Sequence, residues 1–320
     1  MREVVFLKRN EAKWRDVEVM LASGGKNDPD KLADLFIELN DDLSYARTNY
    51  PESKTEIYLN GLASDIYEAI YKNKKEKSNR FVNFWKYELP LTISTAHKQL
   101  LYSFIFFTIS CLIGVVSTSY DENFPRIILG DHYVEMTLEN IEKGDPMAVY
   151  KDSDSESMFF GITSNNIRVS FYTFLSGFFI SFGSYWFLFR NGVMLGAFQW
   201  FFFKKGLLWT SFLTIWIHGT IEISCIIIAG TAGIVLGNSI LFPGTYSRKL
   251  SLISGAKRSS KIFLGIIPLI VLAGFLESFV TRLTDSHWSI RLLIILGSAA
   301  FVLYYFVWYP LKLKKENNEV

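Results

Sequence analysis

The chain has 320 residues, half of them hydrophobic and 16% aromatic, with a mean hydropathy of +0.20 and a formal net charge of +2. A soluble globular protein of this length is usually less apolar and less aromatic, so this composition excludes a wholly soluble chain. The apolar residues concentrate beyond Gln99, in several runs long enough to cross a bilayer. The sequence therefore predicts an integral membrane protein with a soluble N-terminal part.

Residues 1–78 contain three apolar stripes at helical spacing. The stripes include Trp14, Val17 and Leu21, then Phe36, Leu39 and Leu43, then Leu59, Leu62 and Ile66. Such stripes can bury one another in a small bundle, and this region has no Gly-rich phosphate loop, metal-ligand spacing or nucleophile beside a base. We expect a cytosolic helical bundle that serves packing or the docking of a partner.

Residues 79–98 predict an amphipathic helix that lies in the membrane interface. Basic residues are dense from Lys72 to Lys86, and an apolar face accompanies them. That face consists of Phe81, Phe84, Trp85 and Leu89. The pattern suits basic side chains that reach anionic lipid headgroups. Because these lysines stand directly before a membrane span, the expected partner is the lipid bilayer, and no nucleic-acid partner is expected.

Residues 99–311 predict a transmembrane bundle of about six helices. The apolar runs lie near 99–119, 162–184, 187–204, 207–240, 262–281 and 290–310. Basic residues precede the first run, follow the fourth and occupy the tail 312–320, which places both termini in the cytosol. The acidic segment 120–158 is expected outside. The expected fold class is all-α: a polytopic transmembrane helix bundle with a small N-terminal cytosolic helical domain and an interfacial helix.

Two runs leave the number of spans open. Residues 187–204 are short for a full span and also suit one arm of a re-entrant hairpin. Residues 207–240 would form a helix about 50 Å long, so this run must tilt, break or project from the membrane. Gly230, Gly233 and Gly237 are candidate points for a break or for close helix packing.

Ionisable and amide side chains occur inside or beside the apolar runs, where they are costly unless they face the bundle interior. These candidate residues of an intramembrane polar network are Asn165, Asn166, Arg168, Arg190, Asn191, His218, Glu222, Glu277 and Thr281. Arg190 and Asn191 are expected at the turn between the second and third runs. His218 and Glu222 are four residues apart and share one helix face, which Glu277 can approach from another helix.

Three interpretations of these polar residues remain. They form a structural hydrogen-bond network that sets helix register, or a proton or ion relay in a transporter. As a minor alternative, His218, Glu222 and Glu277 are the ligands of a metal-dependent hydrolase. The spacing from His218 to Glu222 lacks the second histidine and the internal glutamate of an HExxH motif. No catalytic residue, metal or cofactor is therefore assigned.

Small residues indicate close helix packing. Gly192 and Gly196 form one GxxxG pair, and Gly233 and Gly237 form a second. Gly219 and Gly230 add further small positions to the fourth apolar run. In a polytopic chain these glycines favour packing within the protein, and they leave a homodimer open.

Five segments together resemble one known family. They are "NNIRVSF", "NGVMLGAF", "HGTIEISCIIIAGTAGIVLG", "FPGTYSRKLSL" and "AGFLESFVT". In this order they resemble the stage II sporulation protein M family from about Trp85 to Pro310. The matching positions are Asn165, Asn166, Asn191, Gly192, His218, Gly219, Glu222, Pro243, Gly244, Glu277 and Thr281. The resemblance implies a multi-span inner-membrane protein without an established catalytic activity, and it implies partners such as a MoxR-type ATPase system.

The function expected from these observations is that of a non-enzymatic integral membrane component of a cell-envelope complex, in an assembly or scaffold role. The expected location is the bacterial cytoplasmic membrane, with other envelope or membrane proteins as partners. The alternative is a proton- or ion-coupled transporter of a lipid or envelope precursor that uses a polar cavity around Glu222. The intramembrane hydrolase remains the minor alternative.

Overall fold

A computed structural model describes residues 2–22, 29–72, 80–150, 154–282 and 287–318, and every regular element in these ranges is a helix. The chain divides into two compact units, Met1–Phe81 and Val82–Val320. The predicted all-α class is therefore confirmed.

The N-terminal unit contains α1 (Glu3–Ala22), α2 (Pro29–Asn49) and α3 (Lys54–Lys72). Their apolar stripes meet in one core, as the helical spacing predicts. The core side chains are Phe6, Trp14, Val17, Leu39, Leu43, Ala46, Leu59, Leu62, Ala63 and Ile66. Trp14 is almost fully buried, and its indole Nε1 donates a hydrogen bond of 2.9 Å to Asp42. The predicted domain boundary at 78–79, with Lys74, Lys75 and Lys77 before it, lies outside the described residues.

The segment predicted as an interfacial helix consists of three short pieces: α4 (Arg80–Asn83), the π-helical η1 (Phe84–Glu88) and α5 (Leu89–Thr95). Phe81 is exposed, whereas Leu89 is fully buried. Leu89 packs so closely on α12 that a Cβ atom at Gly265 would overlap its side chain. The end of this segment therefore belongs to the core of the bundle, because Leu89 and Ile93 point into it.

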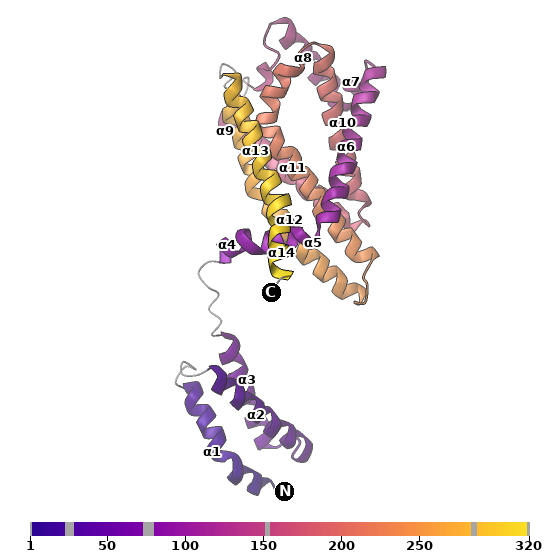
Figure 1. The fold of residues 1–320 in the computed structure, drawn as a ribbon. Coiled ribbons are helices and arrows are strands. Elements are labelled where there is room, and N and C mark those ends of the chain that lie inside the picture. The colour runs from indigo at the N-terminus through magenta and orange to yellow at the C-terminus, as the bar shows by residue number, and fades with distance from the viewer. Residues whose placement is uncertain (1, 23–28, 73–79, 151–153, 283–286, 319–320) are drawn as a thin grey trace. The chain divides into compact units, whose positions relative to one another are not determined.

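The rest of the second unit consists of α-helices of different lengths, with two 3-10 turns and two π-helical turns among the described residues. They are α6 (His97–Tyr120), α7 (Phe124–Leu129), α8 (Asp131–Glu142), the 3-10 turn η2 (Ala148–Tyr150), α9 (Ser155–Leu175), the 3-10 turn η3 (Ser176–Phe178), α10 (Phe182–Lys204), α11 (Leu208–Leu241), α12 (Arg248–Phe275), η4 (Leu276–Val280), α13 (Trp288–Leu303), η5 (Tyr304–Trp308) and α14 (Tyr309–Asn318). Helix α11 runs through the middle of this unit and packs against α6, α9, α10, α12 and α13 (Figure 1).

Helix α11 is continuous, so its length is not accommodated by a break. Its three glycines instead allow close approach of neighbouring helices. A Cβ atom at Gly230 would lie 2.7 Å from Ser103 Oγ, one at Gly233 would lie 2.8 Å from the Thr173 carbonyl oxygen, and one at Gly237 would overlap Ser181. These contacts are the physical reason why α11 occupies the centre of the unit.

Four described helices are long and apolar enough to cross a membrane: α6, α11, α12 with η4, and α13 with its continuation to Glu316. The other two predicted spans also form helices, α9 and α10, but their polar residues keep them below that mark. They meet at a turn near residues 176–181, two helical turns earlier than predicted. Arg190 and Asn191 therefore lie inside α10 and not at the turn. Gly177 shows the reason, because a Cβ atom there would overlap the backbone of Gly233.

The predicted outer segment 120–158 contains α7 and α8. Val134 and Thr137 of α8 are buried, and Val134 shares a small core with Phe202 of α10 and Ile215 of α11. Arg126 of α7 pairs with Glu135 of α8 at 2.6 Å. This segment is thus packed onto the ends of the long helices.

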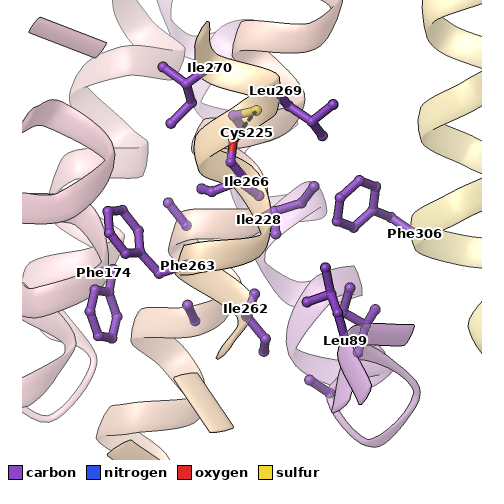
Figure 2. Packing of buried hydrophobic residues seen from close by; sticks show 14 of the residues in the cluster. Leu89, Phe174, Cys225, Ile228, Ile262, Phe263, Ile266, Leu269, Ile270 and Phe306 are labelled. Carbon is purple, nitrogen blue, oxygen red and sulfur yellow. Dashed lines mark hydrogen bonds between the residues drawn. The ribbon is translucent and has the colours of Figure 1, made fainter. Parts of the chain in front are cut away.

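The main core of the second unit lies along α12 (Figure 2). Ile262, Ile266 and Ile270 recur at helical spacing and are almost fully buried. Phe174 of α9 stacks on Phe263 of α12 with ring centroids 5.2 Å apart. This packing holds α9, α11 and α12 in fixed register, which positions the polar residues described next.

Candidate functional site

Three ionisable side chains from two separate segments meet inside the bundle. His218 and Glu222 come from α11, and Glu277 comes from η4 at the end of α12. Their potential metal-ligand atoms all lie within 4.8 Å of one another. His218 Nε2 is 3.8 Å from Glu277 Oε1. The structure thus brings together residues that are 59 positions apart in the sequence at the widest, counted from His218 to Glu277.

The π-helical turn η4 positions Glu277. In this turn the Thr281 amide donates to the Leu276 carbonyl, five residues back, at 2.8 Å. A π-helical turn fits one extra residue into a helix and changes the direction of the side chains that follow, and such turns are frequent at functional sites. Glu277 and Thr281 consequently both face His218 of α11.

Thr281 fixes the orientation of the His218 ring. Its hydroxyl oxygen lies 3.0 Å from His218 Nδ1 and donates its hydrogen to the Leu276 carbonyl at 3.1 Å. The hydroxyl has one hydrogen, so its oxygen accepts the hydrogen bond from Nδ1–H. The other ring nitrogen, Nε2, is then the acceptor of the ring and points toward Glu277.

Most of the cluster is buried, whereas Glu222 is half-buried. His218 is 4% exposed and Thr281 is 2% exposed, while the Glu277 side chain is 14% exposed. Buried carboxylates are costly unless a cation, a proton or hydrogen-bond donors compensate them. Among the described residues, no lysine or arginine forms an ion pair with Glu222 or Glu277. A proton, a bound cation or a hydrogen-bond donor such as the Asn166 amide would compensate these carboxylates.

A cavity of about 360 Å³ adjoins the cluster between α10 and α11. His218, Glu222 and Asn191 supply polar groups to its wall, together with Tyr133 of α8. The remaining lining is mostly apolar: Phe107, Ile128, Leu129, Met194, Leu195, Phe198, Ile215, Gly219, Ile223 and Ile226. The wall of this cavity is therefore mostly apolar, with a few polar groups and the Glu222 carboxyl among them.

The other predicted network residues divide into two groups. Asn166 of α9 faces the Glu222 carboxyl, although its buried amide nitrogen has no described partner in full hydrogen-bond geometry. Asn165, Arg168 and Arg190 are exposed and do not join the cluster. The reason is helical phase: a neighbouring residue is rotated by about 100° on a helix of 3.6 residues per turn.

Some of the predicted packing glycines lie at contacts between helices, and Gly219 does not. Gly192 and Gly196 of α10 lie against the backbone of α6, near Phe107 and Cys111. Among the described residues, Gly219 has no close neighbour from another helix, because a Cβ atom there would contact only Ile215 and Ile223 of α11. Gly219 instead lines the cavity.

Sequence reasoning missed Tyr133 and Thr163. Tyr133 of α8 borders the cavity. Thr163 of α9 has a buried hydroxyl without a described partner, against Gly274 of α12. A small polar residue three positions before Asn166 on α9 was the signal available.

The fold and the site define a polytopic α-helical membrane protein with a histidine–carboxylate cluster inside its bundle. The chain belongs to the stage II sporulation protein M family, whose model matches residues 103–282. That match begins in α6 and ends directly after Thr281, so it includes the cluster. Residues 4–72 match a second family model, described as a domain of unknown function (DUF8413). Comparison with curated proteins and with solved structures found no match.

Proposed function

We propose that this protein is a non-enzymatic component of a cell-envelope complex in the bacterial cytoplasmic membrane, with both termini cytosolic. The observation that carries the proposal is the division into a compact N-terminal unit and a separate bundle, each with its own family match. A scaffold needs a stable membrane anchor and a domain that can bind a partner. The glycine contacts of α6, α10 and α11 supply a tightly packed anchor.

The N-terminal unit is the proposed docking domain. Its described part has a core of its own and contains no group of histidine, cysteine or carboxylate side chains arranged for a metal. Other envelope or membrane proteins are the proposed partners, with a MoxR-type ATPase system as the cytosolic candidate. The basic loops that flank the apolar runs support the cytosolic placement of this unit.

Crosslinking in the native membrane tests this proposal. The full chain is compared with a chain that begins at Arg80, which keeps the bundle and lacks α1, α2 and α3. The expected result is that specific crosslinked proteins disappear with the shortened chain while its amount in the membrane stays normal. Recovery of the same crosslinked proteins from both chains would refute docking through the N-terminal unit.

A second candidate function is proton- or ion-coupled transport of a lipid or envelope precursor. The cavity that borders Glu222 favours it, because intramembrane carboxylates beside a cavity commonly serve as relay groups. Glu222→Gln keeps the shape and removes the ionisable group. Transport predicts loss of function at normal membrane abundance, whereas a structural role predicts that the variant disappears from the membrane. Asn191→Ala, in the same cavity wall, is the control for a change in cavity shape.

A further inference from the structure

We propose that His218, Glu222 and Glu277 bind one divalent transition-metal cation, with the coordination position beyond the protein ligands facing the cavity. This inference goes beyond a scaffold role and does not depend on any partner. One imidazole nitrogen and two carboxylate oxygens are donors that suit Zn²⁺ and Mn²⁺. No sulfur joins them, because the Cys225 thiol points to the Ile266 carbonyl (Figure 2).

The orientation of the His218 ring suits a metal ligand. Thr281 accepts from Nδ1–H, which leaves Nε2 as the acceptor nitrogen. Metal-binding histidines usually donate their second ring N–H to an oxygen in this way, which fixes the ring and its tautomer. Thr281 is thus a positioning residue for His218.

The distances between the possible ligand atoms also suit a bound metal ion. Nε2 and Glu277 Oε1 are both acceptors, and their separation of 3.8 Å exceeds a hydrogen bond. Two ligands of a tetrahedral zinc site at bond lengths near 2.1 Å are about 3.4 Å apart. The acceptors of His218, Glu222 and Glu277 lie within 4.8 Å of one another, so rotation of the glutamate side chains brings them to ligand distance.

The charges of Glu222 and Glu277 also favour a bound cation. Two carboxylates that face each other in an apolar interior repel when both are ionised, and a divalent cation between them removes that repulsion. The cavity beside His218 and Glu222 provides space for a water molecule or another oxygen ligand in the fourth position. A site with three protein ligands and one open position follows from these residues.

The test uses the full chain purified into lipid nanodiscs, stripped with a chelator, loaded with Zn²⁺ or Co²⁺ and dialysed. We expect about one bound ion per chain. The Co²⁺-loaded protein should show the visible absorption bands of four-coordinate Co²⁺, and these bands should disappear when Zn²⁺ replaces Co²⁺. His218→Ala and Glu277→Gln should lose the ion. His132→Ala, on the exposed side of α8, and Glu88→Gln, in an ion pair with Lys261, should keep it.

Thr281→Val separates ligation from folding. It retains the three ligands and removes the hydroxyl that orients His218, so the affinity for Zn²⁺ should fall about 10- to 100-fold. If a ligand variant fails to fold, the Co²⁺ spectrum of the unaltered chain and the Thr281→Val affinity decide the question. Absence of a stoichiometric ion, or equal metal content in the variants of His218 and Glu277 and in the control variants, would overturn the proposal.

Discussion

Gly192 of α10 lies directly against Ser110 of α6. A Cβ atom added at Gly192 would be 2.6 Å from Ser110 Cβ and 2.9 Å from the Phe107 carbonyl oxygen. Both distances are too short for ordinary contact, so a larger residue must push the two helices apart. The pair is one of several close contacts between α6 and α10, together with those of Gly114 and Gly196.

Gly192→Ala should therefore destabilise the bundle by about 1–3 kcal/mol, the usual cost of overpacking a tight interior. Thermal unfolding of the purified protein in one detergent measures the effect. Gly297→Ala on α13 is the matched control, because no atom of the described residues lies within 4 Å of the added Cβ. An equal change in melting temperature for both variants would show that close packing at Gly192 is not the cause.

Leu89→Ala tests the placement of the predicted interfacial segment in the core. Leu89 is 0% exposed and packs on Gly265 of α12, so its truncation leaves a cavity and should cost about 2–5 kcal/mol. Leu293→Ala on α13, where the side chain is 71% exposed, should change stability little. If both variants unfold at the same temperature as the parent, Leu89 does not contribute to the core.

Trp14→Ala should destabilise the N-terminal unit without affecting the bundle. Trp14 is 2% exposed and hydrogen-bonds Asp42, and the loss of such a side chain costs about 3–5 kcal/mol. Amide hydrogen exchange should become faster throughout α1, α2 and α3 and stay unchanged in α11. Ile37→Ala, at a position that is 61% exposed, serves as control. Faster exchange in α11 as well would contradict two independent units.

The stability of the N-terminal unit should depend on Tyr58 at alkaline pH. Burial, together with the hydrogen bond that the Tyr58 hydroxyl donates to Glu18, raises the pKa of Tyr58 from 10.0 to about 12. Since the folded-state pKa is the higher one, this stabilisation is complete below about pH 10 and is lost as pH rises toward 12. Urea unfolding monitored by proteolysis of α1, α2 and α3 at several pH values measures it.

Tyr58→Phe provides the comparison for that measurement. The variant lacks the ionisable hydroxyl, so its stability should decline less steeply than that of the parent above pH 10. Parallel pH profiles for the two proteins would exclude a contribution from ionisation of Tyr58.

Local patterns in the sequence determined much of this protein. The apolar runs were sufficient to predict α6, α11, α12 and α13, because hydropathy and length are properties of contiguous residues. The spacing of Trp14 and its neighbours was sufficient to predict the helices of the N-terminal unit, since an amphipathic stripe follows from helical periodicity. The shared face of His218 and Glu222 follows from the same periodicity.

The tertiary structure alone decided how these elements meet. The approach of Glu277 to His218 depends on the π-helical turn η4, and the spacing of apolar residues does not predict this turn. The turn near Gly177 and the exposure of Arg190 depend on which residues of α11 face α9 and α10. Helical periodicity specifies which residues share a face. The neighbour of that face is set by packing between residues far apart in the chain, and the sequence of one helix does not contain that information.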